Sequence, residues 1–178
     1  DAKGERKWNY RIQHRNLYGH EMTHYDADRD GLDEVYISLN GKFIVLNGDG
    51  TLRWSDDTVR NHTDFILCGD VDGDGELEIV YDRNGCDALK GPIACVDGRT
   101  GKPEKLWNYR RPGMDHLQRA TLGDFDPSRP GLELVAVGKR QIRGGLVLWS
   151  AEEDHLWHKD IPAGWVTWGD WNGDRNPE

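Results

Sequence analysis

The sequence is poor in hydrophobic residues and holds no long apolar run. Hydrophobic residues make up 36% of the 178 residues, and the mean hydropathy is −0.82. Because no stretch approaches the roughly 18 consecutive apolar residues of a transmembrane helix, we expect no membrane span. The formal net charge is −9. Basic faces bind nucleic acids, so this acidic balance argues against a nucleic-acid partner.

Cysteine is also scarce, with Cys68, Cys86 and Cys95 as the three residues of this type. Cys86 and Cys95 flank a hairpin that contains Gly and Pro, so they could pair and leave Cys68 free, whereas three reduced thiols are an equal alternative. The chain is instead rich in tryptophan and glycine, with eight Trp and 22 Gly. Disordered chains lack aromatic residues, so we predict an ordered protein with many turns and short strands.

Two sequence markers recur in phase at intervals of about 45 to 55 residues, the scale of a structural repeat. The first marker is an acidic loop, Asp-x-Asp-x-Asp-Gly-x-x-Glu in its clearest form. The loops begin at Asp26, Asp70, Asp124 and Asp170. The second marker is a tryptophan, which we predict to pack between units because it follows the repeat. These residues are Trp8, Trp54, Trp107 and Trp157.

Each unit contains four short segments with the composition of β-strands. In the clearest unit these are residues 62–69, 78–81, 93–96 and 106–109. Four antiparallel strands in about 45 residues are typical of a propeller blade. We therefore predict an all-β fold, a β-propeller of four-stranded antiparallel blades, with a self-contained β-sandwich as the alternative.

A single partial propeller over residues 1–178 would correspond to a fragment of about three to four blades, whereas closed rings have roughly four to eight. The predicted repeat units are approximately 12–55, 56–110, 111–158 and an incomplete 159–178. Since the sequence stops inside the fourth acidic loop, we expect the remaining blades to come from sequence outside this chain.

The second acidic loop offers the oxygen ligands that calcium prefers. Its carboxylates stand at positions one, three, five and nine, a backbone carbonyl stands at position seven, and a glycine at position six permits the sharp turn. These ligands are Asp70, Asp72, Asp74, the Glu76 carbonyl and Glu78. Magnesium prefers to keep its waters, and zinc prefers His and Cys. We therefore predict calcium as the cofactor, with an acidic turn without metal as the alternative.

Two further loops offer a similar ligand set. In the first loop the set is Asp26, Asp28, Asp30, the Leu32 carbonyl and Glu34. In the fourth loop it is Asp170, Asn172, Asp174, the Asn176 carbonyl and Glu178. The third loop, residues 124–133, has an extra residue, and Ser128-Arg129 replaces its fifth position. Whether this third loop holds metal stays open.

Three stretches of the sequence resemble a known family. They are residues 19–35, which lead into and through the first loop, residues 96–101 with the following Trp107, and residues 123–133. They look like FG-GAP and related calcium-loop propeller repeats, and more specifically like the rhamnogalacturonan lyases of polysaccharide lyase family eleven. That resemblance implies an eight-bladed calcium propeller. The family's Gly-His-Gly-Asp segment appears here as Asn61-His62-Thr63-Asp64.

The resemblance implies eliminative cleavage of a uronide. This reaction needs a group that neutralises the C6 carboxylate, a base for the C5 proton and an acid for the leaving oxygen. His62 and His116 precede their acidic loops by the same interval, His20 precedes the first loop, and Arg119 follows His116 closely. We predict these four residues as the catalytic group, with roles in hydrogen bonding within the repeat as the alternative.

The leading hypothesis is therefore part of a secreted or cell-surface, calcium-dependent polysaccharide lyase that cleaves an acidic, pectin-type polysaccharide by β-elimination. A first alternative is a non-catalytic FG-GAP-type propeller that binds glycans or proteins at a cell surface. A second alternative is a structural repeat of an extracellular assembly.

Overall fold

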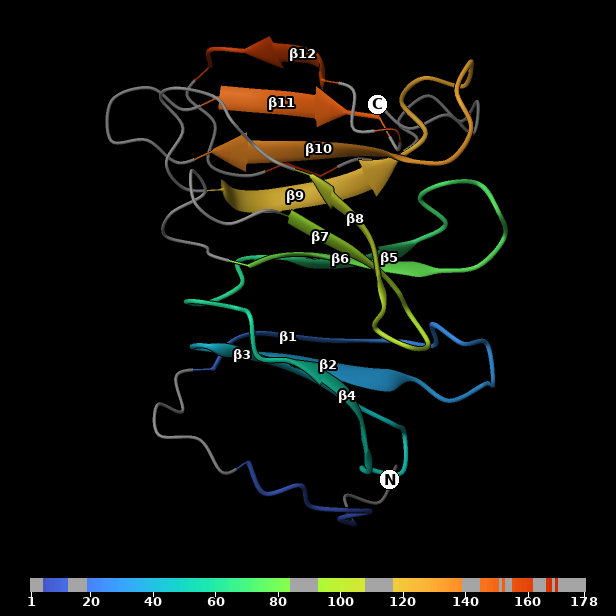
Figure 1. Cartoon of the computed structure of the whole chain (residues 1–178), viewed down its shortest axis with the longest axis vertical. Coiled ribbons are helices and arrows are strands. Elements are labelled where there is room, and N and C mark those ends of the chain that lie inside the picture. Colours follow the sequence, from blue (N-terminus) through green and yellow to red (C-terminus); the bar gives the residue numbers. More distant parts are fainter. Residues whose placement is uncertain are drawn as a thin grey trace.

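The computed structural model describes residues 5–12, 19–83, 93–107, 117–138, 145–150, 152, 155–161, 166, 167 and 169. In this part of the chain the protein is all-β and consists of three four-stranded antiparallel sheets (Figure 1). The all-β prediction is confirmed. The described residues contain no helix that could cross a membrane.

The strands of each sheet pair in chain order. The first sheet contains β1 (Gly19–Tyr25), β2 (Glu34–Leu39), β3 (Lys42–Leu46) and β4 (Leu52–Asp56). The second sheet contains β5 (Ile66–Gly69), β6 (Glu78–Asp82), β7 (Ile93–Asp97) and β8 (Pro103–Trp107). The third sheet contains β9 (Leu117–Gly123), β10 (Glu133–Gly138), β11 (Gly145–Trp149) and β12 (His155–Lys159).

The hairpin between β2 and β3 follows directly from its sequence. Leu39 pairs with Lys42, so only Asn40 and Gly41 form the turn. Gly41 has a φ of 84°, a left-handed conformation that two-residue hairpin turns require and that glycine adopts without steric cost.

The fourth strand of each sheet carries an irregularity in pairing at the same place. In the first sheet, Leu46 pairs with Leu52 and Val45 with Trp54, which leaves one extra residue between the two pairs. The second and third sheets show the same shift. A β-bulge of this kind places two residues opposite one and redirects a side chain. The extra residues are Arg53, Glu104 and Leu156.

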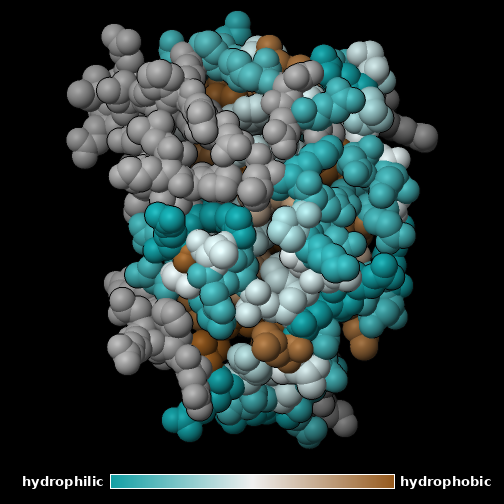
Figure 2. Space-filling view, in the orientation of Figure 1, coloured by the Kyte–Doolittle hydropathy of each residue, from teal (hydrophilic) through white to brown (hydrophobic). Residues whose placement is uncertain are grey.

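The sheets pack face to face, and the second sheet is covered on both sides (Figure 1). All five residues of β6 are buried. Because successive side chains of a strand point to opposite faces, Ile79 and Tyr81 pack toward the first sheet, whereas Val80 packs toward the third. The visible surface in Figure 2 is mostly hydrophilic, with small separate hydrophobic areas.

The repeated tryptophans join neighbouring units. The indole nitrogen of Trp54 donates a hydrogen bond to the Gly98 carbonyl in the β7–β8 turn at 3.5 Å. Trp8 donates in the same way to the Gly48 carbonyl in the β3–β4 turn at 3.0 Å. Trp107 is buried in the cluster between the second and third sheets. These contacts agree with the predicted packing between units, but Trp157 on the edge strand β12 is 39% exposed.

The cysteines favour the reduced alternative. Cys68 and Cys95 are free thiols, and Cys86 lies outside the described residues. Burial raises the pKa of the Cys68 thiol to about 12 and that of Cys95 further still.

Candidate functional site

The acidic loops connect the first and second strands of each sheet. We call residues 26–34 the first loop, 70–78 the second loop and 124–133 the third loop. Each ends in a glutamate that begins the second strand and is almost completely buried: Glu34, Glu78 and Glu133. In each case its Oε2 accepts the N–H of the residue after the first aspartate. These donors are Ala27 at 3.1 Å, Val71 at 2.7 Å and Phe125 at 2.8 Å.

In the second loop, carboxylates converge in the way that a cation site requires. Ligand oxygens of Asp70, Asp72 and Glu78 lie within 4.8 Å of one another. Burial raises the pKa of Glu78 to about 7, and the neighbouring charges of Asp72 and Asp74 add to this shift. A divalent cation would relieve this repulsion, so the donor set fits calcium.

The backbone of the second loop is shaped by its own side chains. Asp70 Oδ2 accepts the N–H of Gly75 at 3.1 Å, and Asp74 Oδ1 accepts that of Glu76 at 2.8 Å. Gly75, at the sixth position, has a φ of 95°. The predicted glycine turn is therefore present, and the curvature of the loop is set by the aspartate side chains and this glycine.

The first loop has the same backbone form but a different electrostatic environment. Ligand oxygens of Asp26, Asp28 and Glu34 also lie within 4.8 Å of one another. However, the guanidinium of Arg53 pairs with Asp28 and, at 2.9 Å, with Glu34. The hydrogen bond from Arg53 lowers the pKa of Asp28, whereas burial raises that of Glu34. This loop therefore already contains a positive charge.

The third loop is less regular, as its sequence predicts. Asp126 is engaged by Arg129 at 3.2 Å and by the Ser128 hydroxyl at 2.5 Å. Asp124 Oδ1 and Glu133 Oε1 are buried and have no hydrogen-bond partner within the described structure. The ligands expected in the fourth loop, between residues 170 and 178, and the predicted catalytic His116 all lie outside the described residues.

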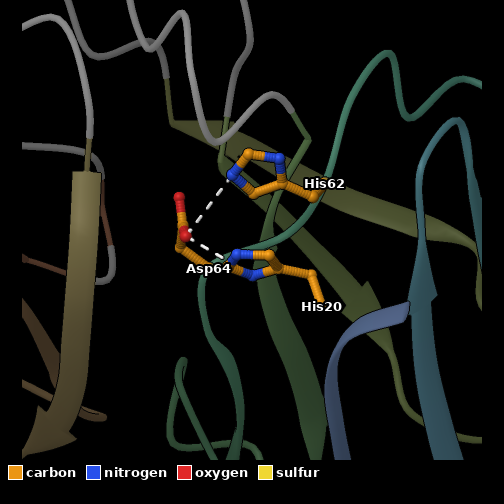
Figure 3. Close-up of side chains that lie close together, drawn as sticks. All are labelled: His20, His62 and Asp64. Carbon is orange, nitrogen blue, oxygen red and sulfur yellow. Dashed lines mark ion pairs between the residues drawn. The ribbon is translucent and has the colours of Figure 1, made fainter. Parts of the chain in front are cut away.

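A second cluster joins two histidines to a buried aspartate (Figure 3). His20 lies on β1, whereas His62 and Asp64 lie in the segment before β5. The imidazole rings stack with centroids 4.1 Å apart. His20 Nδ1 and His62 Nε2 each lie 3.6 Å from Asp64 Oδ1. The side chain of Asp64 is 4% exposed and that of His20 is 39% exposed, so the cluster reaches from the core to solvent.

The position of Asp64 is held by a buried carboxyl group beneath it. Asp82 Oδ1 accepts the N–H groups of Asp64 at 2.7 Å and Phe65 at 3.4 Å. Burial raises the pKa of Asp82 well above its ordinary value, and the charge of Asp64 adds to this shift. The hydroxyl of Thr63 donates to the Asp82 carbonyl at 2.9 Å, which fixes the same segment to the end of β6.

Arg119 on β9 completes the group. Its Nη1 donates to the Asp64 carbonyl at 2.5 Å and lies 3.7 Å from Glu21 Oε2. The first strands of neighbouring sheets, β1 with β5 and β5 with β9, contact each other. The stacking of the sheets therefore brings together three of the residues predicted from sequence, His20, His62 and Arg119.

Sequence reasoning did not select Asp64 or Asp82 as site residues. The sequence offered an indication for each of them. Asp64 follows His62 by two residues, and Asp82 stands at the end of the buried strand β6. A charged side chain beside a buried apolar strand requires a partner. Imidazole, carboxylate and guanidinium groups together can transfer protons and neutralise an anion, and the first two can also hold a divalent cation.

The fold and these clusters define an all-β protein of stacked four-stranded sheets with acidic loops after the first strands. Comparison of the sequence with protein-family models and with curated proteins gives no match. Among solved structures, the chain is similar to a rhamnogalacturonan lyase of polysaccharide lyase family eleven from Bacillus licheniformis, with a TM-score of 0.64 and 17% identity. The match covers 89% of this chain and 39% of the lyase. At this identity the likeness shows a relation in fold, and the chain spans about two fifths of the lyase's length.

Proposed function

We propose that this chain is part of a calcium-dependent β-propeller lyase, secreted or at the cell surface, that cleaves an acidic, pectin-type polysaccharide by β-elimination. The observation that carries the proposal is the meeting of His20, His62 and Arg119 around Asp64. The relation in fold to a rhamnogalacturonan lyase supports the same class of substrate.

In this proposal the three sheets are successive blades of a propeller. Their first strands contact each other in order, as the inner strands of neighbouring blades do. A ring closes with roughly four to eight blades, so three sheets form part of a ring and further blades complete it. The His20, His62 and Arg119 cluster then lies beside the central opening.

The tautomer of His20 indicates which group removes the C5 proton of the uronide. His20 Nδ1 lies 3.3 Å from the Thr63 carbonyl oxygen. A carbonyl can only accept a hydrogen bond, so Nδ1 carries a proton, and in the neutral imidazole Nε2 then has the lone pair and can act as a base. His20 Nε2 takes the C5 proton, His62 gives a proton to the departing C4 oxygen, and a C4–C5 double bond forms.

Two other groups support this chemistry. Arg119 neutralises the C6 carboxylate and thereby acidifies the C5 proton. Asp64 is a positioning residue, because it holds both imidazoles and is itself held by Asp82.

Calcium in this proposal stabilises the fold. The second loop holds the ion through Asp70, Asp72, Asp74, the Glu76 carbonyl and Glu78. Because the loop joins the first and second strands of a blade, bound calcium supplies folding free energy. The same composition predicts a calcium ion in the fourth loop.

The test is a lyase assay with rhamnogalacturonan and other uronides in the presence of calcium, monitored by the ultraviolet absorbance of unsaturated product. His20→Gln and His62→Gln should each lower kcat/KM by about 10²–10⁴-fold, the contribution typical of acid–base groups. His24→Gln is the matched control, because His24 lies on the same strand and pairs with Asp33 on the surface. Binding of a uronide without any product would refute the lyase and favour the non-catalytic propeller.

A further inference from the structure

The bulge in the fourth strand places a different side chain in each sheet at structurally equivalent positions. The extra residue is Arg53 in the first sheet, Glu104 in the second and Leu156 in the third. Arg53 reaches the acidic loop of its own sheet and pairs with Asp28 and Glu34. The equivalent residue of the second sheet, Glu104, has the opposite kind of side chain.

Arg53 is held in the first loop by contacts on both sides of its guanidinium. It pairs with Asp28 and with Glu34 Oε1. Nη1 also donates to Asn47 Oδ1 at 3.2 Å, and Nε donates to the Arg99 carbonyl in the β7–β8 turn at 2.9 Å. The Arg53 side chain is only 15% exposed. A planar guanidinium with this many partners is fixed in place and is not a surface group that swings away.

We propose that Arg53 takes the place of a calcium ion in the first loop, so that this loop is closed by an internal cation while the second loop binds calcium. The two loops share their aspartate spacing and backbone hydrogen bonds, so the difference arises from the residue in the bulge. The proposal rests on calcium binding by the second loop and is independent of the lyase activity.

Charge explains why Arg53 and calcium exclude each other. Calcium requires six to eight oxygen ligands, and two of the carboxylates that would supply them are already paired with Arg53. A calcium ion would also meet the fixed positive charge of Arg53 a few ångströms away in a buried setting. Asp26 Oδ1 is buried without a hydrogen-bond partner in the described structure. A single such oxygen is too few to bind calcium.

The second loop has the opposite environment. Glu104 occupies the bulge position of the second sheet that Arg53 occupies in the first. The second sheet therefore has an acidic residue at the position where the first sheet has the arginine that pairs with its loop. Negative charge near the ligands strengthens the attraction for a divalent cation.

The test is the number of calcium ions bound by the full-length protein, measured by calorimetric titration and by metal analysis after gel filtration. Arg53→Gln should bind one calcium more than the unsubstituted protein, and Glu104→Arg should bind one fewer. Lys42→Gln is the matched control, because it removes the same charge from the first sheet by breaking the pair with Asp57 and leaves the loop intact. This control should leave the count unchanged.

Two further variants test calcium binding by the second loop separately from the role of Arg53 in the first loop. Asp28→Asn should not change the calcium count, whereas Asp72→Asn should lower it by one. An unchanged count in Arg53→Gln, or a loss of one ion in Asp28→Asn, would overturn the proposal. If Arg53→Gln fails to fold, Asp28→Asn alone decides the question. An unchanged count in Asp72→Asn would refute calcium in the second loop without touching the role of Arg53.

Discussion

Asp56, at the end of β4, links the first sheet to the second through one largely buried carboxylate. Its Oδ2 accepts hydrogen bonds from the Tyr81 hydroxyl at 2.8 Å and from Arg83 Nη2 at 2.7 Å. Its Oδ1 accepts the Thr58 N–H at 2.7 Å. Burial alone would raise the pKa of Asp56, but the hydrogen bonds from Thr58, Tyr81 and Arg83 hold this pKa below its ordinary value.

Replacing this carboxylate should destabilise the fold. We expect Asp56→Asn to lower the free energy of unfolding by about 2–4 kcal/mol, because Arg83 would lose its partner in a largely buried setting. The neighbouring Asp57 is the control. Its side chain is 71% exposed and pairs with Lys42 on the surface, so Asp57→Asn should change stability by less than about 0.5–1 kcal/mol. Urea denaturation of both variants measures the difference.

Asp56 should also make the stability of the fold depend on pH in a predictable direction. Because the pKa of Asp56 is lower in the folded state than in the unfolded chain, its contribution to stability is present above the unfolded value of about 4 and is lost as the pH falls. The unsubstituted protein should therefore lose stability below about pH 4 more steeply than Asp56→Asn. An equal loss of stability with falling pH in the two proteins would contradict this role of Asp56.

At the scale of elements, the same contact recurs between a tryptophan and the turn that precedes a fourth strand. The indole of Trp54 lies against Gly101 in the β7–β8 turn, and that of Trp8 lies against Gly50 in the β3–β4 turn. Both glycines have positive φ, 69° for Gly101 and 85° for Gly50. Each turn therefore needs glycine for two reasons: glycine permits the positive φ, and its lack of a side chain leaves space for the indole.

Gly101→Ala should separate these two effects when it is compared with Gly31→Ala. A Cβ on Gly101 would approach Trp54 Cε2 to 2.8 Å, whereas a Cβ on Gly31, with a φ of 90°, would meet nothing within 4 Å. Gly31→Ala should lower the unfolding free energy by about 1–2 kcal/mol through backbone strain alone. Gly101→Ala should lose about 1–3 kcal/mol more through overpacking. Equal losses in thermal or urea unfolding would show that the indole contact contributes nothing.

At the scale of the whole molecule, the second sheet links the other two. Its two faces belong to different hydrophobic clusters, one shared with the first sheet and one with the third. The second loop lies beside this link, because Leu132 of the third loop donates its N–H to the Val71 carbonyl at 3.0 Å. Calcium in the second loop should therefore stabilise the packing of two sheets.

Calcium removal should accordingly lower the stability of the whole molecule. At a calcium concentration one hundred times the Kd, a single site contributes about 2.7 kcal/mol, and a chelator should remove this contribution. Asp72→Asn should have a lower Tm in calcium and a smaller response to chelator, whereas Asp57→Asn should respond like the unsubstituted protein. A Tm that does not depend on calcium in any of these proteins would contradict a structural ion.

The sequence predicts those features that depend on residues close together in the chain. The Asn40-Gly41 turn, the glycine turn at Gly75 and the four-strand unit all follow from local patterns, because hairpin geometry and side-chain alternation act over a few residues. The phase of the repeat predicted equivalent positions for His62 and His116, but His116 lies outside the described residues. Calcium binding by the acidic loops and the catalytic roles of His20, His62 and Arg119 remain predictions.

The charge environment of each loop arises only in the folded chain. Arg53 is 25 residues from Asp28, and Asp56 is 27 from Arg83, and no local pattern reports such contacts. The bulge in the fourth strand directs Arg53 to the first loop, whereas Glu104 occupies the same position in the second sheet, although the sequences of the two loops are almost the same. Spacing along the chain specifies where acidic loops form, whereas strand register and sheet stacking decide which charge each loop meets, because electrostatic interactions depend on distance in space.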